Sequence, residues 1–175
     1  MKLKILIMAA GLVVFVSCGP SYRVADQSNP EGNGNVPAAI QSSFNSQYPT
    51  ATDVMWTPYD ANNLPIDWTL TGWNDVGDGA YVSTFTLDDN QYYSWYDASG
   101  NWIGSTYAIR DYSTLPSPVS TTISGKFPGY TITSVNSELQ KDKMNYEITL
   151  KNADGKAKVV IDSNGNIVKQ KMVTK

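Results

Sequence analysis

The segment VPAAIQSSFNSQYP, residues 36–49, has a counterpart 79 residues later in LPSPVSTTISGKFP, residues 115–128. Both segments begin with an apolar residue and a proline, repeat apolar residues at a spacing of four, and end in an aromatic residue followed by proline. Proline is tolerated in the first turn of a helix, and the spacing of four places the apolar side chains on one stripe. The closing proline restricts the preceding residue to extended backbone. Each segment is therefore predicted to be a short amphipathic helix.

A second correspondence, at an offset of 65, follows each predicted helix. The matched residues are Tyr81, Phe85, Asp97, Gly100 and Asn101 in the first copy and Tyr146, Leu150, Asp162, Gly165 and Asn166 in the second. Residues 144–150 alternate between apolar and polar, which is typical of an antiparallel strand with one wet face. The Asp-x-x-Gly element predicts a turn, because glycine adopts positive φ. First strands are expected near residues 53–57 and 131–139.

These patterns predict an α+β fold built by tandem duplication. Each unit is expected to hold one helix and about four antiparallel strands, with the helices packed on one sheet face. The first copy spans residues 36–110, a short joint spans 111–114, and the second copy spans 115–175. A unit of this size buries little surface alone, so we expect one fused domain.

The first 17 residues resemble the signal peptide of a bacterial lipoprotein. Lys2 and Lys4 precede an apolar run over residues 5–16 that is too short to span a bilayer as a helix. The lone cysteine, Cys18, follows and is the predicted lipidation site. Lipoprotein signals prefer leucine three residues before the cysteine, where this chain has Phe15, so a plain secretory signal is the alternative.

Residues 18–35 are expected to be the lipidated cysteine and a flexible tether, since they are polar and rich in Gly, Asn, Ser and Pro. Gly19 directly after the cysteine resembles lipoproteins sent to an outer membrane. Lipoproteins that are exported to the cell surface have an acidic run after the cysteine, and this chain has none. We therefore expect an exported, periplasm-facing outer-membrane lipoprotein that contacts the membrane through its lipid anchor.

The Leu-Pro or Val-Pro start, the aromatic-Pro helix end, the Tyr-centred strand and the Asp-x-x-Gly-Asn turn occur twice behind the lipoprotein signal. Together they resemble the PepSY-like family, also described as beta-lactamase-inhibitor-protein-like and abundant in Bacteroides-type bacteria. The resemblance covers about residues 36–172. It implies a tandem helix-on-sheet fold with no known catalytic residues. Related PepSY domains are suspected of binding or inhibiting proteins such as proteases, so the resemblance implies a tendency toward binding.

The two copies differ in length, charge and aromatic content. The offsets imply 14 extra residues in the first copy, as an insert near residues 58–80. Residues 36–110 have a net charge of −7 and residues 115–175 a net charge of +4. All five tryptophans lie in the first copy.

Trp and Tyr make rigid contact surfaces, so the excess of aromatic residues predicts a binding surface in the first copy. The candidates are Trp68, Trp73, Tyr93, Trp95 and Trp102. In the alternative interpretation, the aromatic residues pack under the insert or at the joint. The charge difference has a similar alternative, in which it holds the copies together or leaves solvated faces.

Catalysis has few candidate residues in this sequence. The chain has no histidine, which excludes Ser-His-Asp and Cys-His systems and ordinary zinc sites. No P-loop or dinucleotide-binding glycine pattern occurs. We therefore expect no enzyme and no cofactor. Weak calcium candidates are Asp75, Asp78, Asp88 and Asp89, although the last two are more simply explained by a turn.

The sequence thus favours a non-catalytic, lipid-anchored binding module for an unknown protein partner in the cell envelope. Nucleic acid is not expected as a partner, because the net charge is −3 at pH 7. Two alternatives stay open. One is a glycan-binding envelope protein that uses exposed Trp and Tyr, and the other is an envelope protein with no specific ligand.

Overall fold

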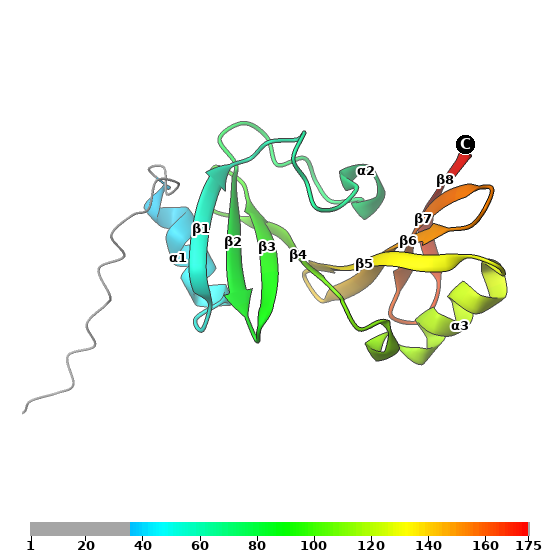
Figure 1. The fold of residues 1–175 in the computed structure, drawn as a ribbon. Helices are drawn as coiled ribbons and strands as arrows, with labels where there is room; N and C mark the ends of the chain where they lie inside the picture. Colours follow the sequence, from blue (N-terminus) through cyan, green and yellow to red (C-terminus); the bar gives the residue numbers. More distant parts are fainter. Residues whose placement is uncertain (1–35, 175) are drawn as a thin grey trace, which may run out of the picture.

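The computed structural model describes residues 36–174 (Figure 1). The predicted signal peptide, Cys18 and the tether lie outside the described residues. The helices are α1 (Ala38–Gln47), α2 (Trp68–Thr71) and α3 (Ser117–Lys126), with a 3-10 helix η1 (Tyr112–Thr114). The strands are β1 (Thr52–Pro58), β2 (Tyr81–Leu87), β3 (Asn90–Tyr96), β4 (Trp102–Ala108), β5 (Thr131–Gln140), β6 (Lys143–Lys151), β7 (Gly155–Asp162) and β8 (Ile167–Thr174).

All eight strands form one antiparallel sheet in chain order, from β1 at one edge to β8 at the other. A mixed fold with an antiparallel sheet is therefore confirmed. The two longer helices begin directly after Pro37 and Pro116, which are their N-cap residues and lie just before the first turn in which the sequence predicts them. None of the helices within residues 36–174 has the length and apolar character that crossing a membrane requires.

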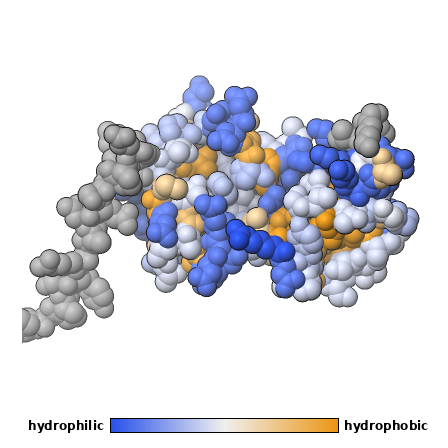
Figure 2. Space-filling model, in the orientation of Figure 1, coloured by the Kyte–Doolittle hydropathy of each residue, from blue (hydrophilic) through white to orange (hydrophobic). Residues whose placement is uncertain are grey.

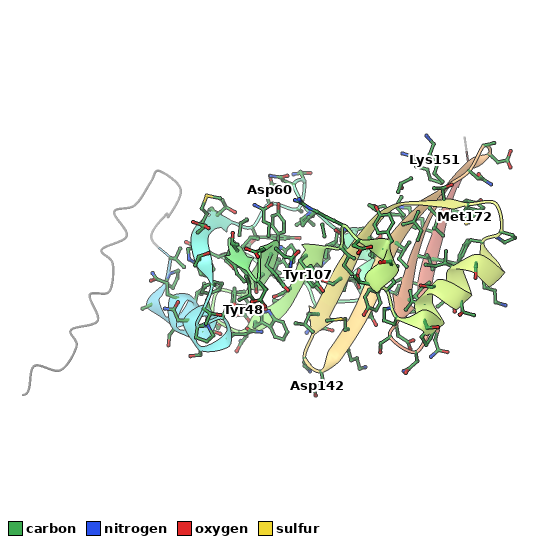
Figure 3. The ribbon with its side chains drawn as sticks, turned by 60° about the horizontal axis from the view of Figure 1, so that its bottom comes forward. Tyr48, Asp60, Tyr107, Asp142, Lys151 and Met172 are labelled. Carbon is green, nitrogen blue, oxygen red and sulfur yellow. The ribbon has the colours of Figure 1, made fainter. Side chains whose placement is uncertain are left out.

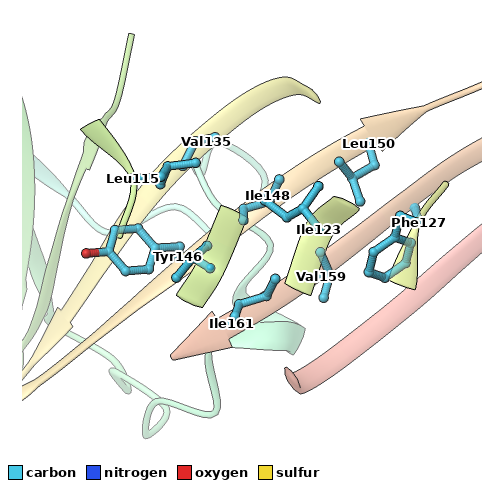
Figure 4. Packing of buried hydrophobic residues seen from close by; sticks show 11 residues of the cluster. Leu115, Ile123, Phe127, Val135, Tyr146, Ile148, Leu150, Val159 and Ile161 are labelled. Atoms are coloured by element: carbon cyan, nitrogen blue, oxygen red, sulfur yellow. The ribbon is translucent and has the colours of Figure 1, made fainter. Parts of the chain in front are cut away.

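The two longer helices, α1 and α3, each contribute to one hydrophobic cluster. The first-half core contains Val36, Ile40, Phe44, Tyr48, Trp56, Phe85 and Tyr96. The second-half core contains Leu115, Val119, Ile123, Phe127, Val135, Tyr146, Ile148, Leu150, Ala157, Val159 and Ile161 (Figure 4). The register aligns Phe85 with Tyr92, Tyr107, Ser137 and Tyr146 across five strands. Residues paired directly across antiparallel strands share a face, so both cores lie on the same face of the sheet.

The predicted Asp-x-x-Gly-Asn turns close each half in the same way. Asp97 Oδ1 accepts hydrogen bonds from the backbone N–H of Ser99 and Asn101, each at 2.9 Å. Asp162 makes the equivalent pair of bonds at 2.9 and 2.8 Å. In each turn, the aspartate side chain therefore stabilises the backbone conformation that the Asp-x-x-Gly pattern predicts.

The glycine of each turn lies against the first turn of the helix in its half. Gly100 has a φ of +88°, and an added Cβ would lie 3.0 Å from the carbonyl carbon of Ala39. Gly165 has a φ of +87°, and an added Cβ would lie 2.7 Å from the carbonyl oxygen of Pro118. Both positions therefore require glycine for its backbone conformation and for its small size.

The halves meet along a short stretch of the sheet. β4 and β5 pair only over Ser105–Ala108 and Asn136–Leu139, whereas β5 and β6 pair along the full length of β5. The two outer edges also differ. β1 contains a bulge at which Asp53 has a φ of 52°, and it ends at Pro58. β8 carries the exposed Lys169 and Lys171 instead.

Candidate functional site

Residues 59–80, here called the insert, connect β1 to β2 and contain α2. In Figure 1 this segment crosses from the first half of the sheet toward β5–β7. The insert packs against Trp95, so it lies on the sheet face that carries Trp95 and Glu138. The two cores lie on the opposite face. Figure 3 shows Asp60 of the insert on the first half, far from Lys151 and Met172 at the outer end of the second half.

The helix α2 is short and is fixed at both ends. Asp67 precedes it, and its Oδ1 accepts hydrogen bonds from the backbone N–H of Thr69 at 3.3 Å and from its hydroxyl at 2.6 Å. Gly72 ends the helix in a left-handed conformation with a φ of 68°. The aspartate is thus a helix N-cap, and the glycine is a typical C-terminal stop.

Polar contacts attach the insert to the second half. The backbone N–H of Asp67 donates to Glu147 Oε2 at 2.8 Å. Lys158 Nζ lies 3.6 Å from both Asp67 Oδ2 and Glu147 Oε1, and Lys171 Nζ lies 3.8 Å from Asp67 Oδ2. Asn136 Nδ2 also donates to the Pro65 carbonyl at 3.4 Å. The insert therefore belongs to the first half by sequence and contacts the second half by structure.

Beneath the insert, three tryptophans form the centre of a third cluster, here called the insert core. The ring centroids of Trp68 and Trp73 lie 5.4 Å apart, and both lie 5.5–5.7 Å from that of Trp95, all in edge-to-face geometry. The close approach of Trp73 requires a glycine below it, since a Cβ on Gly104 would lie 2.7 Å from the ring. These aromatic contacts anchor the insert on the sheet.

This arrangement corrects the prediction of an exposed tryptophan surface. Trp95 is 0% exposed and Trp73 is 7% exposed, because each packs against the other inside the insert core. Trp102 lies on the opposite face, where its indole N–H donates to the hydroxyls of Ser94 at 3.0 Å and Ser105 at 2.8 Å. The five candidates therefore do not share one surface. The burial of Trp73 and Trp95 agrees with the alternative in which aromatic residues pack under the insert, whereas Trp68, Tyr93 and Trp102 are half-buried.

The strand register also decides between the two pairings that the sequence left open. A bulge between Trp95 and Tyr96 places Tyr96 opposite Trp102 and Trp95 opposite Gly104. Tyr96 consequently joins the first-half core, while Trp95 and its neighbour two residues earlier, Tyr93, face the insert.

Tyr93 is the one half-buried candidate that lines open space next to the insert core. It borders two adjoining hollows of about 490 and 220 Å³, which share Tyr93 and Pro65. Thr57, Thr84 and Asp60 line the larger hollow. In the view of Figure 2, apolar surface forms separate patches among polar residues. We call this pair of hollows the Tyr93 groove.

The weak calcium candidates do not converge. Asp88 and Asp89 occupy the β2–β3 turn with φ values of 48° and 60°, which supports the simpler explanation as turn residues. Asp75 accepts a hydrogen bond from the backbone N–H of Gly77 at 3.3 Å, and Asp78 is exposed. Across residues 36–174, no three His, Cys, Asp or Glu side chains gather in a way that suits a metal ion.

Two buried glutamates near the insert were not predicted as site residues. Glu138 is 1% exposed, and neither of its carboxyl oxygens has a hydrogen-bond partner within the described part of the chain. Burial, together with the nearby charge of Glu147, raises the pKa of Glu138 to about 8, although Lys169 opposes the shift. Burial also raises the pKa of Glu147, against the hydrogen bond from Asp67 and the charge of Lys158.

The only sequence signal for these two glutamates is their position on the polar face of β5 and β6. Such a face is ordinarily wet, so the signal predicts solvated carboxylates. Their burial depends on an insert that arrives from a distant part of the chain.

Known proteins similar to this chain support one family. The family described as "Putative beta-lactamase-inhibitor-like, PepSY-like" matches residues 80–169. No curated protein sequence matches the chain.

Solved structures from Bacteroides share the fold. A BLIP-like protein from Bacteroides fragilis NCTC 9343 has a TM-score of 0.64 at 19% identity, over 82% of this chain and 91% of that chain. A DUF2874 family protein from Bacteroides ovatus ATCC 8483 has a TM-score of 0.63 at 18% identity, over 80% and 89%. A protein described as "putative periplasmic" from Bacteroides eggerthii DSM 20697 has a TM-score of 0.60 at 16% identity, over 81% and 91%. On the family match, which covers half of the sequence, the chain belongs to the PepSY-like, beta-lactamase-inhibitor-like family.

Proposed function

We propose that this protein is a non-catalytic binding module of the cell envelope that holds a protein partner in the Tyr93 groove. The observation that carries the proposal is the pair of adjoining hollows on either side of Tyr93 and Pro65. The family description, beta-lactamase-inhibitor-like, supports a protein as the partner. The description of a similar Bacteroides protein as periplasmic supports a location in the envelope.

The groove has a rigid wall, which favours binding. The Tyr93 ring stacks against Trp95 with a centroid distance of 6.4 Å and an interplanar angle of 24°. Trp95 is fully buried, and Pro65 on the other side is held through its carbonyl by Asn136. A partner side chain that enters the groove therefore meets groups that are already in place, so it loses less free energy to ordering them.

The charge of the first half favours a basic partner. Asp60 lines the larger hollow, where no basic side chain opposes it, whereas Asp89 and Arg110 both line the smaller one. Residues 36–110 have a net charge of −7. Complementary charge raises the association rate more than it raises affinity, and added salt weakens the effect. We therefore propose a protein that presents Lys or Arg beside an apolar or aromatic side chain.

The proposal extends to the organisation of the whole chain. The two halves act as tandem duplicates of one helix-and-sheet unit with the helices on one sheet face, and only the first half carries an insert that shapes a groove. Cys18 would attach the chain by lipid to the outer membrane, and the groove would face the periplasm. The placement of α1 and α3 at the same offset as their sequence signals supports the duplication.

A photoreactive amino acid tests the groove in the native cell. Thr57 and Thr52 are both exposed residues of β1, but only Thr57 lines the larger hollow. We expect a crosslinked product of one defined mass from position 57, identified by mass spectrometry, and none from position 52. Tyr93→Ala in the position-57 variant should remove the product. Equal labelling from both positions, or labelling that survives Tyr93→Ala, would exclude the groove as the binding site.

Binding to a glycan is less well supported by the structure. The burial of Trp73 and Trp95 removes two of the rings on which that alternative depends, and Tyr93 is the ring that remains at the groove. A glycan array read with tryptophan fluorescence separates the two functions. Absence of any crosslinked protein together with silence on glycans would favour an envelope protein with no specific ligand.

A further inference from the structure

The Glu138 carboxyl lies in a closed position between two attachment points of the insert. On its face of the sheet, Glu138 pairs with Thr106 on one side and with Asn145 on the other. The neighbouring pair along the strands is Asn136 with Glu147, and residues 65–67 bond to both of them. Trp73 covers Gly104, which lies two residues from Thr106 along β4 in the opposite direction.

The insert therefore contacts the sheet on both sides of the row that contains Glu138. This enclosure explains why a carboxyl group on the polar face of a strand is only 1% exposed. It also explains why both of its oxygens lack a hydrogen-bond partner within residues 36–174. Burial of an ionised carboxylate without hydrogen bonds is strongly unfavourable, whereas the neutral acid costs much less to bury.

The charged groups around Glu138 come from three other elements. Glu147 on β6 and Asp67 on the insert oppose its ionisation, and Lys169 on β8 favours it. Lys158 and Lys171 are engaged with Asp67, and Lys158 also with Glu147, so their charge is partly neutralised there. A negative charge on Glu138 would therefore repel Asp67 and Glu147, the carboxylates that attach the insert to the second half.

We propose that the protonation state of Glu138 controls the attachment of the insert to the second half of the sheet. The neutral form of Glu138 lies closed beneath residues 65–73, and loss of its proton releases these residues from the second half. The released state exposes Trp95, which the insert otherwise covers. The device goes beyond the proposed binding function, because it concerns the insert and not the occupant of the groove.

The direction of the pH dependence follows from the pKa of Glu138, which is raised to about 8 in the closed state. In the released state the side chain meets water, and its pKa returns toward about 4.3. Below the lower value both states are protonated, so pH has no effect. Between the two values the released-to-closed ratio rises about tenfold per pH unit, because one proton is lost on release. Above the upper value the ratio is constant.

Hydrogen exchange measured by mass spectrometry tests the proposal on the intact folded protein. Peptides that cover residues 65–73 are compared between the wild type and Glu138→Gln at each pH, so that the intrinsic pH dependence of exchange cancels. We expect the exchange rate of the wild type relative to the variant to rise at least tenfold between pH 5.5 and pH 8.5. A constant ratio across this range would overturn the proposal.

Lys169→Gln provides a second variant if Glu138→Gln does not fold. Lys169 favours the ionised form of Glu138, and its Nζ also donates to the Thr69 carbonyl at 3.5 Å. If Glu138 controls the insert, removal of this charge raises the closed-state pKa of Glu138 further, so the released-to-closed ratio keeps rising to a higher pH before it becomes constant. If Lys169 acts only as a tether, its removal increases exchange equally at every pH, and the proposal is wrong. Asp78→Asn serves as the matched control, since Asp78 is an exposed carboxylate of the insert that lies outside residues 65–73 and lines neither hollow of the Tyr93 groove.

Discussion

Neighbouring aromatic residues in this chain differ in role: some are buried in the fold, and others are accessible to a partner. Trp95 and Tyr93 are two residues apart on the same face of β3 and both line the larger hollow, yet Trp95 is 0% exposed and Tyr93 is half-buried. The difference comes from Trp73, which covers the strand only as far as Gly104, the partner of Trp95. Composition alone assigns the same function to both rings, because it does not indicate which of them the insert covers.

Trp95→Ala should lower the free energy of unfolding by about 3–5 kcal/mol, as expected for removal of a fully buried large side chain. Trp102→Ala should cost less, since Trp102 is half-buried at the edge of the first-half core. Urea unfolding followed by circular dichroism measures both values. An unchanged midpoint for Trp95→Ala would show that the insert does not pack as described.

Gly104→Ala tests the contact with Trp73 more finely. The new Cβ would lie 2.7 Å from the ring, so the ring must move, at a cost of about 1–3 kcal/mol. Gly125→Ala is the matched control, because Gly125 lies in α3 with no atom within 4 Å of the added Cβ. Alanine is the better helix former, so the control should gain up to about 1 kcal/mol in chemical denaturation. Equal effects of the two substitutions would contradict the described packing.

At the scale of elements, what the sequence predicts correctly is local. The helices, the strands and the Asp-x-x-Gly turns follow from periodicity and turn chemistry within a few residues. The face of β3 could not be predicted, because it depends on a bulge between Trp95 and Tyr96, and one residue of slip exchanges the faces. The course of the insert could not be predicted either, since it is fixed by a bond between Asp67 and Glu147, 80 residues apart.

The turns predict how stability responds to acid. Hydrogen bonds from the side chain and backbone of Asn166 hold the pKa of Asp162 below its ordinary value. A lowered pKa stabilises the fold above the unfolded value of about 3.9, and this stabilisation is lost as the pH falls through the folded value. Melting temperatures measured from pH 6 to pH 2.5 should therefore fall less steeply for Asp162→Asn than for the wild type. A wild-type slope in Asp162→Asn would contradict the assignment.

The whole molecule is one sheet with two cores on one face and a single insert on the other. The strand contact between the halves spans only four residues on each of β4 and β5. The insert adds Asp67, Lys158 and Glu147 as a second connection. Two connections on different elements couple the halves more strongly than the short strand pairing alone.

This coupling predicts a single unfolding transition. All five tryptophans lie in the first half, so their fluorescence reports on that half alone, whereas far-ultraviolet circular dichroism reports on both. In urea, the two signals of the wild type should give the same midpoint, which is the test of two-state unfolding. Asp67→Ala removes the N-cap of α2 and both ion pairs of the insert, and it should separate the midpoints. Separate midpoints already in the wild type would show that the halves unfold independently.

The unequal edges of the sheet have a consequence for self-association. An edge strand offers unpaired backbone groups to any other edge, and open sheets can therefore grow into fibrils. Here the bulge at Asp53 and the terminal Pro58 interrupt hydrogen bonding at one edge, and the exposed Lys169 and Lys171 place charged side chains on the other. Neither edge is a good template for a second molecule. Growth of the folded sheet into fibrils is therefore disfavoured at both of its edges.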